Sequence, residues 1–427
     1  MRILFVHDQF GFHGGAESNI YQTATALKGR GHAVGILHGR ATGQGDVAWR
    51  EVFAHRFPLA GKDDSVTTEA SAKRFQPDVI YVHKTADLEV LEALVDLGLP
   101  LVRMVHDHDL YCMRSYKYHY SSRAICTRAA SPYCIFPCGA SIARNRDGGF
   151  PLKWVSYRAK QREIRLNRRF DRMLVFSHYM KEELLRNGFN AEKIEVHTPL
   201  HADRAEPPPS TFDSRNLILS VGQIIRGKGV DVLLDALATV KTRFECAVLG
   251  DGSHRPHCER LCQELGLSDR VRFPGFVLPH ELAQYYRQCS VAVVSSVWPE
   301  PFGMVGPDAM RYGLPVVAFD VGGIREWLKD GENGFLVPWM DRAQFAQRVD
   351  QLLADKALGR KMGECGRQML REKFSAEEQI RTLERTFASL VALPASRSCE
   401  AQSQKSEVIG QKSNLSLPGL ARSVATR

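Results

Sequence analysis

Short runs of apolar, often β-branched residues alternate along the chain with longer stretches in which apolar residues recur at helical spacing. This alternation predicts βαβ units, and therefore an α/β fold with parallel sheets covered by helices. A first series of strands is expected at Ile3–Val6, Val34–Leu37, Val79–Val82, Leu101–Val105, Met173–Phe176 and Ile194–Val196. A second series is expected at Leu217–Val221, Cys246–Leu249, Val271–Phe276, Val291–Ser295, Val316–Phe319 and Phe335–Val337.

The two series are separated by Ala205-Glu206-Pro207-Pro208-Pro209-Ser210, a stretch that can continue neither a helix nor a central strand. We therefore expect two doubly wound domains, 1–205 and 206–375, that face each other across a cleft. Ligands of such sheets bind at the carboxyl ends of the strands, so the cleft is the expected site. A helix at 376–393 is expected to return to the first domain, and the Ser-rich residues 394–427 are expected to form a disordered tail.

Composition excludes several classes of protein. The 427 residues are 44% hydrophobic, enough for two cores, and no apolar run is long enough to span a bilayer. No signal-peptide core follows Met1, and the ten cysteines are widely spread, so we expect a cytoplasmic protein with reduced thiols. The net charge of +9 is concentrated between Arg144 and Arg172, which contain ten basic and three acidic residues. No nucleic-acid-binding motif accompanies these charges, so no nucleic-acid partner is expected.

Two segments of the second domain suggest binding chemistry. The first strand is followed by Gly222-Gln223-Ile224-Ile225-Arg226-Gly227-Lys228-Gly229 and then by an apolar helical run. A glycine-containing turn, two cations and a helix N-terminus can together hold a diphosphate. An ordinary turn with solvated Arg226 and Lys228 is the alternative.

The second segment contains two carboxylates close to a helix expected to start near Gly303. Glu300 lies in the loop before this helix and Asp308 lies about one turn inside it. Both side chains could face one ligand. Alternatively, they could serve only as partners of the helix N-terminus.

A set of motifs in fixed order extends through the second domain. They are Val221-Gly222 with Lys228-Gly229, Leu249-Gly250-Asp251-Gly252, Val271–Val277, Glu300-Pro301-Phe302-Gly303 with an acid at 308, Gly313–Val317, Gly322–Glu326 and Asp330-Gly331 with Gly334–Val337. Together they resemble the retaining family 4 glycosyltransferases of the GT-B fold. The first domain resembles this family more loosely, in Gly14-Gly15-Ala16-Glu17, His106-Asp107 and Asp171–Ser177.

The resemblance implies a role for each matching residue. Glu300 would hold hydroxyls of the donor sugar, Asp308 the ribose hydroxyls and Lys228 the diphosphate. His106 would lie beside the transferred sugar, and the backbone of Gly14 and Gly15 would approach the phosphates. The remaining expected donor contacts are Phe273–Val277, which includes Phe276 at the base, together with Gln223, Arg226, Phe302, Gly303 and Met304.

The chain departs from the family pattern at two positions. Gln223 stands where the family usually has a phosphate-binding arginine, and Asp308 replaces the usual glutamate. Arg226 could supply the missing cation. These departures keep open a non-catalytic nucleotide-sugar-binding protein, and the shared fold keeps open a sugar-nucleotide epimerase.

Two features could instead indicate a metal. Asp107-His108-Asp109 mimics the D-x-D motif of another glycosyltransferase fold, but its place directly after a strand favours the His-Asp pair of family 4. Cys112, Cys126, Cys134 and Cys138 lie in one insertion, 112–138, and could ligate zinc. Only the last pair has familiar zinc spacing, so unligated thiols are favoured, and no metal or other cofactor is expected.

We therefore expect a metal-independent hexosyltransferase that moves a sugar from a nucleoside-diphosphate sugar to a hydroxyl of a glycan or lipid-linked acceptor, with retention of configuration. Pro151–Arg172 is expected to include a basic helix. With Trp154, Val155 and Tyr157, residues 144–172 could contact an anionic membrane surface, which would make the enzyme peripheral. A solvated basic helix face is the alternative.

Overall fold

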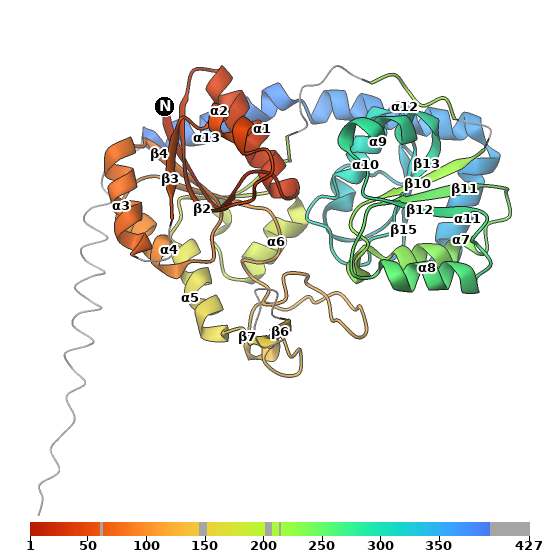
Figure 1. Ribbon diagram of the computed structural model, residues 1–427, viewed down its shortest axis with the longest axis horizontal. Helices are drawn as coiled ribbons and strands as arrows, with labels where there is room; N and C mark the ends of the chain where they lie inside the picture. The colour runs from red at the N-terminus through yellow and green to blue at the C-terminus, as the bar shows by residue number, and fades with distance from the viewer. Residues whose placement is uncertain (60–62, 145–151, 201–206, 213–214, 393–427) are drawn as a thin grey trace, which may run out of the picture.

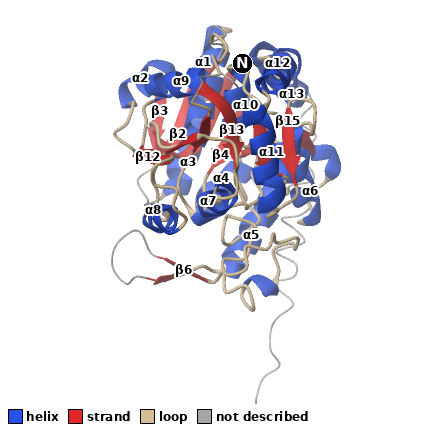
Figure 2. Ribbon diagram, turned by 90° about the vertical axis from the view of Figure 1, so that its right-hand side faces the viewer, coloured by secondary structure: helices blue, strands red, loops and turns tan. Residues whose placement is uncertain are grey.

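The computed structural model describes residues 1–59, 63–144, 152–200, 207–212 and 215–392. Figure 1 shows two α/β lobes, one formed by the N-terminal part of the chain and the other by the part that follows. Each lobe contains its own parallel sheet, and helices lie on both sides of the strands (Figure 2). The predicted pair of doubly wound α/β domains is therefore confirmed.

The first sheet has seven strands in the order β3-β2-β1-β4-β5-β8-β9, all parallel. They are β1 Arg2–Phe10, β2 Ala33–Ala41, β3 His55–Pro58, β4 Val79–Lys84, β5 Leu101–Val105, β8 Arg172–Val175 and β9 Ile194–Val196. The helices of this part are α1 Gly15–Gly29, α2 Asp46–Val52, α3 Asp64–Phe75, α4 Leu88–Asp96, α5 Tyr157–Asn167 and α6 His178–Arg186.

The second sheet has six parallel strands in the order β12-β11-β10-β13-β14-β15. They are β10 Leu217–Val221, β11 Glu245–Leu249, β12 Val271–Gly275, β13 Cys289–Val294, β14 Val316–Phe319 and β15 Gly334–Val337. The helices are α7 Val230–Leu237, α8 Arg255–Glu264, α9 Pro279–Gln288, α10 Val305–Arg311, α11 Arg342–Ala354, α12 Lys356–Lys373 and α13 Ala376–Val391.

In both sheets the strand order reverses at one place, between β1 and β4 in the first and between β10 and β13 in the second. The loops after neighbouring strands diverge at such a switch point, which leaves room for a ligand at the carboxyl ends of the strands. The segments after β10 and β13 are Gly222–Gly229 and Ser295–Gly303. The fold therefore brings the two candidate segments of the second domain to the same edge of one sheet.

Two differences from the sequence prediction have local causes. Strand β3 was not predicted, because only Phe57 of this edge strand is buried and the apolar pattern is too short to recognise. The basic helix expected within Pro151–Arg172 covers only Tyr157–Asn167. Ser156 caps it, its hydroxyl accepting from the Ala159 N–H, and Trp154 lies before the helix in the antiparallel hairpin formed by β6 Ile142–Arg144 and β7 Leu152–Trp154.

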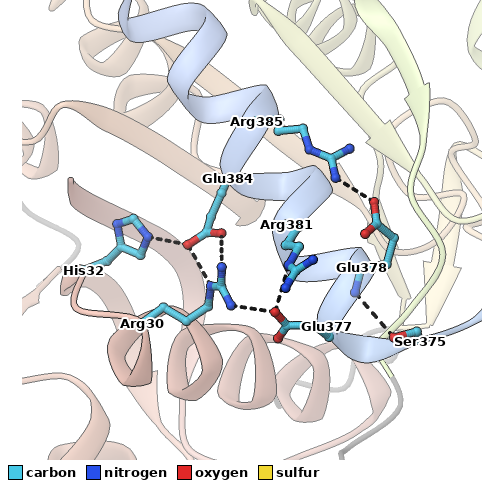
Figure 3. A network of polar contacts seen from close by, with 8 residues as sticks. All are labelled: Arg30, His32, Ser375, Glu377, Glu378, Arg381, Glu384 and Arg385. Atoms are coloured by element: carbon cyan, nitrogen blue, oxygen red, sulfur yellow. Dashed lines mark hydrogen bonds and ion pairs between the residues drawn. The ribbon is translucent and has the colours of Figure 1, made fainter.

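Helix α13 lies against α1 and β4 of the first domain, where Phe387 packs on Tyr81. A network of charged residues reinforces this contact (Figure 3). Glu384 accepts from Arg30 and contacts His32 at 2.7 Å, and Arg30 also pairs with Glu377 at 2.9 Å. The chain therefore returns to the first domain after completing the second.

None of the helices in the described part of the chain combines the length and the apolar character that a membrane span requires. The expected tail, 394–427, lies outside the described residues.

Candidate functional site

The loop after β10 is closely packed on its neighbours. A Cβ atom on Gly250 would lie 1.9 Å from the carbonyl oxygen of Gly222, and one on Gly229 would lie 2.1 Å from that of Ser295. Gly229 also has φ of +65°, a conformation that favours glycine. These contacts fix a short 3-10 helix, Arg226–Lys228, in front of α7 and set the position of Lys228.

Lys228 and Glu300 form an ion pair between the segments that follow β10 and β13. The Lys228 Nζ lies 2.7 Å from Glu300 Oε1, which also accepts from the Trp298 indole N–H at 2.9 Å and from the Ser296 hydroxyl. Burial raises the pKa of the Glu300 carboxyl, but the charge and hydrogen bond of Lys228, with those of Ser296 and Trp298, outweigh it and lower the pKa. Glu300 is therefore an ionised carboxylate in a polar, mostly buried setting.

The backbone around Glu300 is fixed by two glycines. The N–H of Gly323 donates to the Glu300 carbonyl at 2.7 Å, and a Cβ on Gly322 would lie 2.3 Å from the same oxygen. Farther along the chain, Gly303 has φ of +84°. Helix α10 begins at Val305, two residues later than the start expected near Gly303. The Gly322-Gly323 motif is thereby explained as the support of the Glu300 loop.

The other predicted donor residues differ in exposure. Gln223 and Phe276 are exposed at the ends of β10 and β12, and Met304 is half-buried. The Phe302 side chain is buried and packs on Phe374, so any donor contact of Phe302 is made by its backbone. Asp308 is half-buried in the first turn of α10. The pKa of Tyr286 is raised mainly by the burial of its own ring and next by the negative charge of Asp308.

Arg226 is held by the first domain. Its guanidinium stacks over the Tyr120 ring, 5.1 Å from the centroid, and donates to the Ser121 carbonyl at 3.2 Å. The cation suggested as a substitute for the missing arginine thus contacts the insertion 112–138.

A cluster of imidazoles lies at the corresponding edge of the first sheet. His106, directly after β5, contacts His83 at 2.8 Å, and His83 stacks on Phe5. Burial, followed by the charges of His7 and nearby cations, lowers the pKa of His106 to about 3. Burial, followed by the charges of His106, His7 and Arg103, lowers the pKa of His83 well below its usual value. Both rings are therefore neutral at pH 7, and one N–H is shared between them.

The predicted glycine loop of the first domain precedes α1. Gly14 and Gly15 are exposed, and a Cβ on Gly15 would meet no atom within 4 Å. Behind them, Glu17 in the first turn of α1 contacts His7 at 3.0 Å. Burial raises the pKa of Glu17, but the hydrogen bond from His7 and the backbone N–H groups lower it to about 2 overall.

The structure separates the roles of Asp107, His108 and Asp109. Lys84 bridges the two carboxylates and lies 3.2 Å from Asp107 Oδ2. His108 is fully buried, and its Nε2 contacts the Pro299 carbonyl oxygen of the second domain at 2.7 Å. The aspartates therefore hold a lysine, and the histidine joins the domains.

The four cysteines of the insertion are half-buried free thiols. Within the described residues, the side chains that satisfy the geometric requirement for a metal site are Asp231, His254 and His257, not these cysteines. The alternative zinc site at the cysteines therefore gains no support from the geometry.

Several residues of the candidate site were not singled out from the sequence. They are His7, His83, Lys84, Ser296 and Trp298, and His108, which was considered only within the D-x-D motif. Ser296 and Trp298 lie within four residues of Glu300 and could have been chosen for that reason. The others could be recognised only once the sheet and the domain contact had placed them.

Two family models match the chain in succession. Residues 13–199 match the model described as Glycosyltransferase Family 4, and residues 203–369 match Glycosyl transferases group 1. The D-inositol 3-phosphate glycosyltransferase of Corynebacterium urealyticum is 32% identical over 51% of this chain and 53% of its own. The lipopolysaccharide core biosynthesis glycosyltransferase LpsE of Rhizobium meliloti is 33% identical over 38% of this chain and 46% of its own. The chain thus spans about half the length of these curated relatives.

Among solved structures, Anabaena HepE in complex with UDP superposes with a TM-score of 0.70 at 20% identity, covering 91% of this chain and 100% of HepE. Sucrose-phosphate synthase from Thermosynechococcus elongatus superposes with a TM-score of 0.68, also at 20% identity, covering 92% and 99%. At this identity the likeness establishes the fold. Because the family models cover both domains in order, the chain belongs to the group 1, family 4 glycosyltransferases of the GT-B fold.

Proposed function

We propose that the chain is a retaining glycosyltransferase that moves a hexose-type sugar from a nucleoside-diphosphate sugar to a hydroxyl acceptor. The observation that carries this proposal is the ion pair of Lys228 with the buried, ionised Glu300 at the switch point of the second sheet. An ionised carboxylate accepts hydrogen bonds from sugar hydroxyls, and the adjacent ammonium group attracts phosphate.

Departure of the diphosphate is the step that needs electrostatic help. Negative charge develops on the leaving phosphate, and Lys228, the N-terminus of α7 and Arg226 lie on the loop that would receive it. A neutral His106 can exchange a hydrogen bond with the sugar or acceptor without adding charge.

Retention of configuration follows in this proposal from attack on the same face that the diphosphate leaves. We assign no carboxylate as a covalent nucleophile. Glu300 is already engaged by Lys228, Ser296 and Trp298, which suits a residue that orients hydroxyls rather than one that attacks carbon.

The donor and acceptor classes rest on similar proteins. HepE was crystallised with UDP and with UDP-glucose, and LpsE is named for lipopolysaccharide core synthesis. We therefore propose a nucleoside-diphosphate hexose as donor and a glycan or lipid-linked glycan as acceptor, in polysaccharide or glycolipid synthesis. Work on a lipid-linked acceptor would place the enzyme at the cytoplasmic face of a membrane as a peripheral protein.

A thermal-shift screen of UDP-, GDP- and ADP-sugars tests the proposal, because a ligand at a hundredfold its Kd adds about 2.7 kcal/mol of stability. The stabilising donor is then incubated with hydroxyl acceptors, and the nucleotide and glycan products are separated. We expect release of the nucleoside diphosphate and an α-linked product from an α-linked donor. Conversion of the donor without acceptor would indicate an epimerase, and stabilisation without turnover would indicate a binding protein; either result would contradict the proposal.

A further inference from the structure

Three potential metal-ligating side chains converge where α7 and α8 begin. Asp231 lies in the first turn of α7, His254 immediately precedes α8 and His257 lies in the first turn of α8. One ligand atom from each lies within 4.8 Å of the other two. Strands β10 and β11 are parallel neighbours, so the helices that follow them begin at the same edge of the sheet.

Two atoms of this cluster are buried without a hydrogen-bond partner among the described residues, Asp231 Oδ1 and His254 Nε2. The His254 Nε2 lies 3.6 Å from Asp231 Oδ2, beyond the range of a normal hydrogen bond. Buried polar atoms are nearly always satisfied, by protein, water or an ion. A ligand bound between the carboxylate and the imidazole would satisfy both atoms.

We propose that Asp231, His254 and His257 bind a divalent transition metal, with zinc as the best match. Two imidazole nitrogens and one carboxylate oxygen are donors that zinc accepts, with water in the fourth position. In a tetrahedral site with bonds of about 2.0–2.2 Å, neighbouring ligand atoms lie about 3.3–3.5 Å apart. From the present spacing of up to 4.8 Å, the ligand atoms need to approach one another by at most about 1.5 Å.

Arg123 holds the Asp231 carboxylate through the oxygen other than the one proposed to bind the metal. It reaches from the insertion of the first domain, and its Nη2 donates to Asp231 Oδ2. Oδ1 is left for the metal, in the way that ligating carboxylates are commonly held by a second hydrogen bond. Asp231 follows Lys228 by three residues, so the metal would brace α7 and α8 where the insertion meets the donor loop.

The test is isothermal titration of the chelator-stripped full chain with zinc chloride alone. We expect one zinc per chain, and affinity at least tenfold weaker in His257→Gln and in Asp231→Asn. His257 is exposed, so its replacement is compatible with folding, which circular dichroism of each stripped variant verifies. His55→Gln, an exposed histidine of the first domain, is the matched control and should bind like the parent.

A second variant separates this site from the cysteines of the insertion. Cys134→Ser with Cys138→Ser should leave zinc affinity unchanged, and the cobalt-loaded parent should lack an intense thiolate charge-transfer band. No zinc binding, unchanged affinity in His257→Gln and Asp231→Asn, or loss of zinc in the cysteine variant would each overturn the proposal. None of these readouts uses sugar transfer, so the result is independent of the proposed function.

Discussion

The His108 ring of the first domain contacts the Pro299 carbonyl oxygen of the second at 2.7 Å, immediately before Glu300 in the chain. A carbonyl only accepts, so Nε2 carries the proton, and Nδ1 accepts from the Tyr111 hydroxyl at 2.7 Å. Burial lowers the pKa of His108, which keeps the ring in this neutral tautomer. One buried histidine thereby joins the His-Asp segment to the Glu300 loop.

Replacing His108 by Leu should lower both stability and turnover. The change leaves the Pro299 carbonyl and the Tyr111 hydroxyl unsatisfied, and each buried unsatisfied group costs about 1–3 kcal/mol. We expect the free energy of unfolding in urea to fall by at least about 2 kcal/mol and kcat to fall more than KM rises. An unchanged midpoint and kcat, as expected for the exposed control His55→Gln, would contradict this role.

The Lys228–Glu300 pair should be essential for transfer. Glu300→Gln keeps the shape but removes the charge, and Lys228→Ala removes the cation that meets the diphosphate. Each should lower turnover about a hundredfold or more, the scale of losing one preorganised electrostatic contact. Lys361→Ala, an exposed lysine of α12, is the matched control. Near-parental turnover in either folded site variant would disprove the assignment.

The shorter acid at position 308 gives a graded test. If Asp308 binds the ribose hydroxyls, Asp308→Ala should weaken nucleotide binding about tenfold, because a hydrogen bond to a charged group contributes about 1.5–3 kcal/mol. Asp308→Glu should bind at least as tightly as the parent, since the family usually has glutamate here. Equal Kd values for the three proteins by calorimetry would instead assign Asp308 to the N-terminus of α10.

The sequence was sufficient for the parts of the fold that depend on local pattern. Val316–Phe319 was predicted with the boundaries that the structure has, because it is a continuous run of buried apolar residues. Leu101–Val105, Ile194–Val196 and Leu217–Val221, each with one polar residue among apolar ones, were also predicted with their observed boundaries. Glu300 and Lys228 were found because their motifs include the glycines that fix the loops. Their direct contact, across 72 residues, was not foreseen.

The remaining site contacts join residues that no local pattern relates. His108 and Pro299 are separated by 191 residues, and Arg123 and Asp231 by 108. Such pairs depend on how the insertion 112–138 packs on the second domain, which neither periodicity nor spacing specifies. The misplaced Trp154 has a more local cause, since a hairpin of three-residue strands is too short to give an alternating pattern.

The imidazole pair of the first domain predicts acid sensitivity. His106 has a pKa of about 3 in the folded protein and about 6.5 when unfolded, so between these values the unfolded state binds more protons. The contribution of a neutral His106 to stability is therefore fully present above pH 6.5 and is lost as the pH falls toward 3. From pH 6 to pH 4.5, His106 alone accounts for a loss of about 2 kcal/mol.

Urea unfolding of the parent and of His106→Gln at several pH values measures this effect. The variant should be less stable at pH 7 because His83 loses its partner. Between pH 6 and pH 4.5, however, the variant should lose about 2 kcal/mol less stability than the parent does. Parallel curves for the two proteins would show that His106 is already protonated in the folded state or does not titrate on unfolding.

The structure specifies which side chains of residues 144–172 the expected membrane contact would depend on. Arg162 pairs with Glu92 and Arg168 donates to the Asn187 carbonyl, so both cations make contacts within the first domain. Arg165 and Arg169 are exposed, and no ion pair is found for either among the described residues. Nearby in the chain, Trp154 of β7 is 72% exposed.

We therefore expect the protein to sediment with anionic vesicles at low salt and not with zwitterionic ones. Each cation close to the surface contributes about 1 kcal/mol, and an exposed Trp154 can insert at the headgroup level. Replacing Arg165 and Arg169 by Gln, or Trp154 by Ala, should reduce the bound fraction, whereas Lys241 and Arg260, two exposed bases of the second domain, can be replaced by Gln as the charge-matched control. High salt should act like the arginine changes, because it shortens the Debye length. If the control variant loses as much vesicle binding as the arginine variant, net charge alone drives binding. If the protein sediments equally with both lipids, or with neither, these arginines form only a solvated helix face.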